Sequence, residues 1–505
     1  MLIGLDIGST NSGAAWFDGK AARMIDLADS SSILPSVVTI SDGVCLVGRD
    51  AIDAGKRSPA FMFRNWKRQL GAKWHDMEDT GYQTCEGPNG MLAYRGPDDH
   101  VYLPEELYSY VVYELIRAAQ DKLGEMPTGV VLCVPADFIE SQREAAERAV
   151  HLAIDRIRGE DSEVYPFTVE LMHEPTAAAL AYGYDSKKAR RIFVVDLGGG
   201  TLDVSYIQSG GGNTQVKTTN GIRDCGGADW DRMLADFIIS MWRTEHPELT
   251  DPATRDAAMS LIMTEAEDVK KRLSAKTEAL FRIDDFDREQ DGTDVHLSYT
   301  ITRKAFEEMT APLVRRVLGA CQIAMEDARR LDANFSAKDL HDILLVGGMT
   351  RMPSIQEAVK TFFGKTPSKR ENPEQVVALG AAIRGAMLDG RRPDLSINDI
   401  SSHTLAIEVS GDTAAILLPK GSAFPSEVAF SLTNENDNQR QLSLRVIQGE
   451  AHRASVCELL ASAEHPIEPV PAKTARVPLV ARLDASGRPS IMVADRVLYG
   501  EDEAA

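Results

Sequence analysis

Two segments about 190 residues apart share one pattern, and this repeat is the strongest constraint on the fold. Residues 3–17 read IGLDIGSTNSGAAWF, and residues 193–207 read FVVDLGGGTLDVSYI. Each contains an apolar strand with an aspartate near its end, a turn rich in glycine and small polar residues, and a second apolar strand. Glycine adopts the backbone conformations that tight turns need, so each segment predicts a β-hairpin. The repeat predicts a duplicated α/β architecture in which two lobes face each other.

Two further segments place glycine pairs next to helices. Residues 342–364, DILLVGGMTRMPSIQEAVKTFFG, predict a strand, a Gly-Gly turn and a helix that begins near Pro353 and ends before Gly364. Residues 225–242, CGGADWDRMLADFIISMW, lead from a glycine pair into an amphipathic helix. Backbone N–H groups in such turns and at helix N-termini bind anions. Four such turns together are better explained by phosphates held between two lobes than by ordinary loops.

Three aspartates follow or precede these turns, namely Asp6, Asp196 and Asp203. We expect them to converge on one cleft, where their like charges would repel. A divalent cation relieves that repulsion and attracts phosphate oxygens, and Mg²⁺ is suited because it prefers oxygen ligands and keeps several waters. The alternative is that each aspartate merely caps its own turn. Turn capping could account for any single aspartate, but it explains the three aspartates together less well.

The chain is too long for a single core at 505 residues, and its character changes near LDGRRPDLSINDISS. We expect a two-lobed domain at residues 1–388, a linker at 389–402 and a small all-β domain at 403–505. In the last region apolar residues alternate, as at Leu442, Leu444 and Val446, which is typical of strands with one buried face. The fold class predicted is α/β with a β-sandwich appended. Residues 81–100, rich in Gly, Pro and Asp, are expected to form a surface loop.

Charge and cysteine usage exclude several functions. The formal net charge of −21 argues against a nucleic-acid partner and against docking on anionic lipid. The six cysteines have no metal-binding spacing, which fits reduced thiols. The N-terminal residues lack a signal-peptide pattern, and no apolar run is long enough to span a membrane. These features predict a cytoplasmic protein without a membrane partner.

Four motifs together resemble the signatures of the heat-shock protein 70 (DnaK-type) chaperone family. They are HEPTAAALAYG at 173–183, VVDLGGGTLDVS at 194–205, ILLVGGMTRMP at 343–353 and GLDIGSTNS at 4–12. The resemblance extends from residue 1 to about residue 497. It implies a two-lobed actin-like (ribonuclease H-like) ATPase domain that binds ATP or ADP with Mg²⁺ and K⁺. It also implies a β-sandwich that binds unfolded, extended apolar polypeptides.

The resemblance assigns roles to individual residues. Asp6 and Asp196 match the acids that hold hydrated Mg²⁺. Lys67, in RNWKRQLG, matches a lysine that contacts the γ-phosphate and positions the attacking water, which suits a cation near developing negative charge. Glu174 and Asp203 match carboxylates that orient this water. The matching positions for the remaining nucleotide contacts are Gly8, Ser9, Thr10, Asn11, Gly198, Gly199, Gly200, Thr201 (a γ-phosphate contact), Gly226, Gly227, Gly347 and Gly348.

The adenosine is expected to lie against a charged helix. Glu267, Lys270 and Lys271, in EAEDVKKRL, share one helical face, and Ser274 and Arg351 match positions that flank the adenine. Without the resemblance, we would interpret this helical face as a charged stripe that is simply exposed to solvent.

Pro135 and Arg143 match residues that transmit the nucleotide state to the linker. The linker itself departs from the family pattern, because its run of leucines is reduced to Leu395, Ile397 and Ile400 in DLSINDI. We expect this dilution to weaken linker docking.

Other departures concern partners and the nucleotide. Glu170 stands where the family usually has an arginine that receives the acidic motif of a J-domain cochaperone, and His173 stands in place of an asparagine. A glutamate there would repel that motif, so we expect a dedicated J-protein or none, alongside a nucleotide exchange factor. After the glycine pair Gly347–Gly348, Met349 stands where the family usually has a polar residue. In the first phosphate loop, Ser9 stands where the family usually has threonine, and it keeps the hydroxyl group. The short C-terminal region leads us to expect a member without the family's helical lid, similar to the HscC-like branch.

Two alternatives stay open from the sequence. One is a sugar-kinase-like phosphotransferase of the same two-lobed fold, which would need a small-molecule site between the lobes. The other is a non-hydrolysing module that binds ATP as a structural ligand. Sugar kinases and actins share the looser glycine loops but not this combination of motifs.

Overall fold

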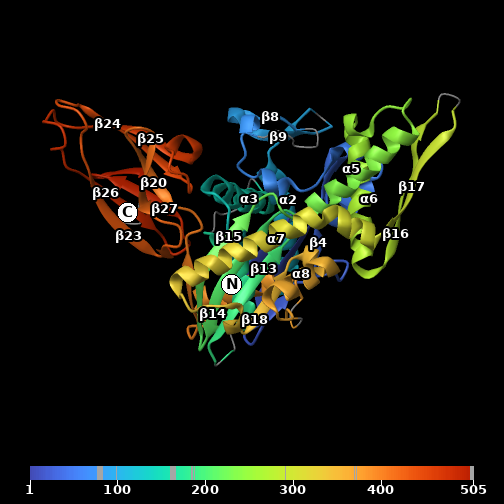
Figure 1. Cartoon of the computed structure of the whole chain (residues 1–505), viewed down its shortest axis with the longest axis horizontal. Helices are drawn as coiled ribbons and strands as arrows, with labels where there is room; N and C mark the ends of the chain where they lie inside the picture. The colour runs from blue at the N-terminus through green and yellow to red at the C-terminus, as the bar shows by residue number, and fades with distance from the viewer. Residues whose placement is uncertain are drawn as a thin grey trace.

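The molecule has a central two-lobed body with two arms, as the computed structural model shows (Figure 1). The C-terminal β domain forms one arm, and a long hairpin with two helices forms the other (Figure 1). The structure describes residues 1–41, 43–76, 84–97, 99–159, 166–183, 186, 188–289, 292–368, 370 and 372–500. Within these residues, no helix combines the length and apolar character needed to cross a membrane.

Lobe I is built on a mixed sheet in the order β12-β11-β1-β2-β3, with β4 paired to β2. Its strands are β1 (Leu2–Ile7), β2 (Asn11–Phe17), β3 (Ala22–Met24), β4 (Leu34–Pro35), β11 (Gly129–Val134) and β12 (Thr168–His173). Its helices are α1 (Gly48–Gly55), α2 (Pro104–Leu123), α3 (Glu140–Arg158) and α4 (Glu174–Gly183). Apolar residues of the sheet pack against α2 and α3 in one buried core.

Lobe I also carries two small antiparallel sheets. One contains β5 (Val38–Ser41), β6 (Val44–Val47) and β7 (Met62–Phe63), and the other contains β8 (Thr84–Glu86), β9 (Leu92–Arg95) and β10 (Val101–Tyr102). The prediction of a surface loop at residues 81–100 is therefore wrong for its described part. Leu92, Ala93 and Tyr94 of β9 are buried, so an apolar strand was hidden among the Gly, Pro and Asp residues; residues 81–83 and 98 lie outside the described residues.

Lobe II repeats the plan of lobe I. Its sheet has the order β18-β13-β14-β15-β19-β22, and the strands are β13 (Arg190–Leu197), β14 (Leu202–Gly210), β15 (Asn213–Ile222), β18 (Asp342–Val346), β19 (Ser396–Ile400) and β22 (Ala423–Phe424). The hairpin β13–β14 pairs antiparallel and β13 pairs parallel with β18, as β1 does with β2 and β11. The duplicated two-lobed α/β architecture predicted from the repeat is confirmed.

Helices and a long hairpin complete lobe II. The helices are α5 (Gly227–Glu245), α6 (Asp256–Ala275), α7 (Arg303–Leu331) and α8 (Pro353–Phe363), and the hairpin is β16 (Glu278–Arg288) with β17 (Asp294–Thr302). Helix α9 (Val376–Leu388) comes later in the chain and packs on β1, β2 and β11 of lobe I and on α4. Helix α8 begins at Pro353, and its C-terminal Gly364 adopts φ 63°, as the sequence predicts.

The β domain consists of two four-stranded antiparallel sheets packed face to face. One has the order β21-β20-β24-β25 and the other β23-β26-β27-β28. The strands are β20 (Leu405–Val409), β21 (Thr413–Leu418), β23 (Ser426–Leu432), β24 (Gln441–Gln448), β25 (Glu458–Pro466), β26 (Val477–Leu483), β27 (Pro489–Val493) and β28 (Arg496–Tyr499). Leu442, Leu444 and Val446 lie in the core between them, so the alternation predicted a buried face correctly.

The segment predicted as a linker forms a strand rather than a free tether. Residues 396–398 of β19 pair parallel with residues 213–215 of β15, and Asp399 and Ile400 pair antiparallel with β22 of the β domain. Leu395 and Ile400 are buried in the core shared with lobe II. One sheet therefore runs from lobe II through the linker into the β domain.

A buried polar contact accompanies the few apolar linker residues. The Asp399 carboxylate lies 3.2 Å from His173 Nδ1 and accepts a hydrogen bond of 2.8 Å from the Thr176 hydroxyl. All three residues are buried. Burial alone would raise the pKa of Asp399, but the charge of His173 and hydrogen bonds from its neighbours hold that pKa below its usual range. His173 and Asp399 thus supply a polar attachment where the leucine run is diluted.

This contact predicts a coupled effect on the linker. Asp399→Asn should raise the hydrogen-exchange rate of the amides at residues 396–400 by at least about tenfold, because removing one partner of a buried polar contact leaves the other unsatisfied. His173→Asn should raise the exchange rate of these amides to a similar extent. The double variant should exchange little faster than either single variant, because both substitutions disrupt one contact. Asp394→Asn is the matched control, because this exposed linker carboxylate pairs with Arg392 in the linker itself. Additive effects of the two single variants would contradict the attachment.

Candidate active site

The two predicted glycine turns meet between the lobes. An ideal Cβ added to Gly199 would lie 2.0 Å from the Thr10 hydroxyl oxygen, and one added to Gly200 would lie 2.3 Å from that of Ser9. No side chain larger than hydrogen fits in this space, so the close approach of the two lobes itself requires these glycines. The turns also share their local geometry, because Gly8 N–H donates to Asn11 O and Gly198 N–H to Thr201 O, both at 3.1 Å.

The third and fourth turns pack on the second. Gly227 N–H donates to Gly198 O at 2.9 Å, which fixes the N-terminus of α5 beside the β13–β14 turn. An added Cβ at Gly226 would lie 2.5 Å from the backbone of Gly200. Gly347 has φ 82°, a conformation that favours glycine, and an added Cβ there would lie 2.3 Å from Leu197 O. All four glycine turns therefore converge, as the sequence predicts.

A cavity of about 310 Å³ lies between these turns. Pockets of this size suit small-molecule ligands and cofactors. The predicted residues that line it are Asp6, Gly8, Ser9, Thr10, Asn11, Lys67, Glu174, Asp196, Gly198, Gly199, Gly200, Thr201, Gly227, Glu267, Lys270, Lys271, Ser274, Gly347, Gly348 and Arg351. Of the predicted site residues, Gly226 and Asp203 are outside this lining. Gly226 packs behind the second turn, and Asp203 is buried next to the cavity.

A cation and a carboxylate form a buried pair at one wall of the cavity. Lys67 Nζ lies 2.7 Å from Glu174 Oε1, and both residues are buried. Lys67 comes from the 3₁₀ turn η2 (Trp66–Gln69), whereas Glu174 begins α4. Burial would lower the pKa of Lys67, but the negative charges of Glu174 and Asp6 outweigh it and raise that pKa. The lysine is thus held charged at the cavity wall.

The aspartates lie in a strongly negative, buried setting. Burial and the charge of Glu174 raise the pKa of Asp6 to about 7, although Lys67 opposes the shift. Burial also raises the pKa of Asp196 well above its usual range, helped by the charges of Glu174 and Asp6. Burial, followed by the charge of Asp137, raises the pKa of Asp203 well above its usual range. Neither carboxylate oxygen of Asp203 has a hydrogen-bond partner in the described part of the chain.

This donor set fits a bound cation. Several buried carboxylates face one polar cavity, and the protein offers few positive charges to balance them. Oxygen-only ligands that are partly unpaired match the preference of Mg²⁺, which completes its shell with water and phosphate oxygens.

At the opposite end of the cavity, Glu267 joins the lobes. Its carboxylate lies 2.7 Å from Arg64 of lobe I and 2.7 Å from Lys271 of its own helix α6. Burial would raise the pKa of Glu267, but the charges of Lys271 and Arg64 lower it to about 2. Lys270 lines the cavity, yet its ammonium group pairs with Asp231 at 2.6 Å and donates to Gly227 O at 2.9 Å. It therefore also ties α6 to the start of α5.

The sequence analysis missed three residues that hold the site together. Arg64 crosses the cleft to Glu267, and Arg68 donates to Gly200 O at 2.8 Å and pairs with Asp229 at 2.6 Å. Both flank Lys67 in the segment FRNWKRQLG, whose density of basic residues was the available signal. Glu374 accepts a hydrogen bond from Asn11 Nδ2 at 2.9 Å and pairs with Arg351 at 2.6 Å. Only its place after Asn-Pro and before a helix marks Glu374 in the sequence.

Comparison with known proteins agrees with this geometry. The family model described as Hsp70 protein matches residues 2–503, and the chain belongs to the Hsp70 family. It is 34% identical over 497 residues to the chaperone protein DnaK from each of two strains of Halobacterium salinarum. The alignment covers 98% of this chain and 73% of each relative. The chain is therefore an ATP-dependent molecular chaperone with ATPase activity, and the phosphotransferase and non-hydrolysing alternatives are not favoured.

The contact between Arg64 and Glu267 predicts control of nucleotide release. Arg64→Ala should increase the rate at which ADP dissociates by about tenfold, because it leaves a buried carboxylate without its partner from lobe I and frees the cleft to open. Stopped-flow displacement of a fluorescent ADP measures this rate. Arg49→Ala is the matched control, since Arg49 pairs with Asp29 within lobe I. Equal release rates in both variants would show that the contact does not hold the cleft closed.

Proposed function

We propose that this chain hydrolyses ATP to ADP and phosphate in the cavity between its lobes, and that it uses the change of nucleotide to bind and release unfolded polypeptide. The observation that carries the proposal is the meeting of four glycine turns beside the buried Lys67–Glu174 pair. Backbone N–H groups of these turns would bind the phosphates, and the N-terminus of α5 would add its dipole.

Each acidic residue has a role in this proposal. Asp6 and Asp196 would hold Mg²⁺ through its waters, and Asp203 would contact a water or K⁺ with its unpaired oxygens. Bound Mg²⁺ neutralises charge on the phosphate oxygens. Glu174 would accept a hydrogen bond from the attacking water and orient it, because its carboxylate is fixed by Lys67 at 2.7 Å.

Lys67 would act on the developing negative charge. Its ammonium group is buried at the cavity wall, where a fixed positive charge stabilises phosphoryl oxygens more strongly than it would in water. The hydroxyl of Thr201 and the turn around Ser9 would complete the contacts to the γ-phosphate. The adenosine would lie against Glu267, Lys271, Ser274 and Arg351.

Removing Lys67 tests this assignment. Lys67→Ala should reduce single-turnover hydrolysis by about 10²–10³-fold, the usual effect of removing one preorganised charge-stabilising group. ATP affinity should change little, because the glycine turns still hold the phosphates. Lys56→Ala serves as control, since this exposed lysine of lobe I pairs only with Asp53 among the described ion pairs. Unchanged hydrolysis in Lys67→Ala would overturn the role of the lysine.

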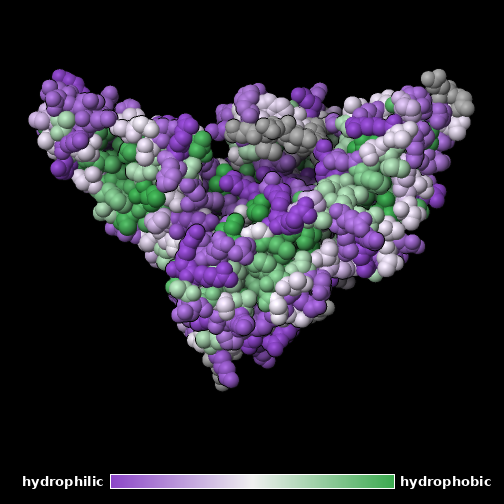
Figure 2. All heavy atoms as spheres, viewed as in Figure 1, coloured by the Kyte–Doolittle hydropathy of each residue, from purple (hydrophilic) through white to green (hydrophobic). Residues whose placement is uncertain are grey.

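The β domain would provide the polypeptide site. Figure 2 shows hydrophobic residues gathered on the visible face of the β domain. Contiguous apolar patches on the surface of a domain mark interaction sites. In the described chain, the large apolar side chains that are exposed on the β domain, on either of its sheets, are Val409, Ile416, Phe430, Val456, Leu459 and Val497. A cytoplasmic location, K⁺ binding and membership of an HscC-like branch remain predictions from the sequence, as do the boundaries at 388 and 402.

A J-domain cochaperone of matching charge would regulate the cycle. Glu170 lies on β12, where Arg384 of α9 donates to its carboxylate at 2.7 Å. Arg384 compensates part of the charge, yet the family's arginine is still replaced by an acid. The proposal is a dedicated J-protein whose contact surface is not acidic at this point.

A charge exchange tests this partner. A generic J-protein should not stimulate ATP turnover of the parent, whereas Glu170→Arg combined with Arg384→Gln should gain at least about fivefold stimulation, because repulsion becomes attraction. Arg384→Gln alone is the control and should gain none. Stimulation of the parent at ordinary cochaperone concentrations would refute the role of Glu170.

A further inference from the structure

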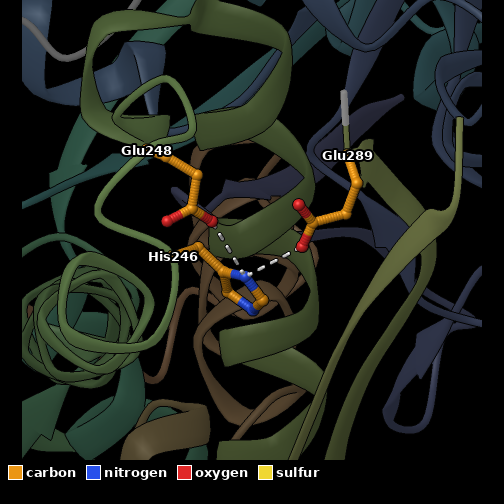
Figure 3. A group of neighbouring side chains, drawn as sticks. All are labelled: His246, Glu248 and Glu289. Carbon is orange, nitrogen blue, oxygen red and sulfur yellow. Dashed lines mark ion pairs between the residues drawn. The ribbon is translucent and has the colours of Figure 1, made fainter. Parts of the chain in front are cut away.

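A histidine and two glutamates converge at the tip of lobe II, far along α5 from the cavity (Figure 3). His246 caps the C-terminal end of α5, Glu248 follows it by two residues, and Glu289 follows the last residue of β16. His246 Nδ1 lies 3.9 Å from Glu248 Oε1 and 3.8 Å from Glu289 Oε1. The three ligand atoms all lie within 4.8 Å of one another.

These separations suit a shared metal ion better than direct hydrogen bonds. A hydrogen bond between imidazole and carboxylate needs about 2.7–3.2 Å, so neither glutamate is bonded to the ring at 3.8–3.9 Å. Two ligands that each lie about 2.0–2.2 Å from a tetrahedral zinc ion are separated by roughly 3.3–3.6 Å. Small side-chain rotations would therefore place all three around one ion.

The surroundings favour a cation and leave the imidazole nitrogen available. The negative end of the α5 dipole points at His246. The nearby arginines are engaged elsewhere, because Arg243 pairs with Asp251 and Arg288 with Asp294. The ring of Trp242 lies 4.6 Å from that of His246 and holds its orientation.

A second histidine on the same hairpin provides an internal comparison. His296 also has two carboxylates near Nδ1, those of Asp284 at 3.7 Å and Asp285 at 3.6 Å. Its Nδ1, however, accepts a hydrogen bond of 2.9 Å from the Asp285 N–H, so the lone pair is used. Nothing in the described residues donates to Nδ1 of His246. The two histidines therefore differ in whether the Nδ1 lone pair is available to bind a metal ion.

We infer that His246, Glu248 and Glu289 bind a divalent transition-metal ion such as Zn²⁺, with water in the fourth position. One imidazole with two carboxylates suits zinc better than Mg²⁺ or Ca²⁺, which prefer oxygen ligands alone. The ion would fasten the C-terminal end of α5 to the β16–β17 hairpin. Helix α5 begins at the third glycine turn, and β16 packs on α6, so the ion would brace two helices of lobe II that reach the cavity. This site is independent of the proposed hydrolysis.

Zinc titration of the full chain tests the site. Calorimetry on chelator-treated, nucleotide-free protein should show one zinc equivalent in the parent and in His296→Ala. His246→Gln and Glu289→Gln should bind that equivalent at least about tenfold more weakly, because each removes a ligand. Zinc bound by the free cysteines or by the carboxylates of the cavity is common to all four proteins and cancels in the comparison.

Two results would overturn the site. One is equal zinc affinity in the parent and His246→Gln. The other is a loss of zinc affinity in His296→Ala as large as the loss in His246→Gln. Hydrolysis of ATP with Mg²⁺ should be the same in all four proteins, which shows that each is folded. In thermal unfolding, zinc should raise the melting temperature of the parent but not that of His246→Gln.

Discussion

The contact between the β1–β2 and β13–β14 turns is the constraint on which the rest of the structure depends. These turns touch so closely that Gly199 and Gly200 have no room for a side chain beside Ser9 and Thr10. Because each turn belongs to the central hairpin of its lobe, their contact sets the spacing of the two sheets. It also brings the turn N–H groups and the penultimate aspartates of β1 and β13 to one cavity. The phosphate site is thus a consequence of how the lobes pack.

Buried charge explains why this cavity needs a ligand. Asp196 and Asp203 are buried and Asp6 is half-buried at the cavity wall, and their raised pKa values record the cost of ionising them there. Lys67 offsets part of this charge, and Arg64 and Arg68 bind acceptors in lobe II from the same short segment. A cation with a polyphosphate would relieve the remaining repulsion. Opening and closing of the cleft would then depend on what the cavity holds.

The same cavity is connected to the β domain through short polar contacts. Glu174 is flanked in sequence by His173 and followed closely by Thr176, and both of these contact Asp399 of the linker. Arg143 approaches His173 at 3.3 Å and donates to Ser486 O of the β domain at 2.7 Å. A movement of the linker would therefore act directly on the start of α4, where Glu174 is held by Lys67.

Local sequence patterns determined the two hairpins, the glycine turns, α8 and the alternating strands of the β domain, because these depend on backbone conformation and periodicity over a few residues. They also indicated that Asp6, Asp196 and Lys67 belong to one site, through the repeat and the family motifs. Only the tertiary structure decided that Arg64 reaches Glu267, that Glu374 contacts Asn11, and that Arg384 compensates Glu170. It likewise decided that the linker is a strand, and that His173 meets Asp399. Each of these pairs joins residues more than 200 positions apart, and which charges meet across a cleft is set by lobe packing rather than by local sequence.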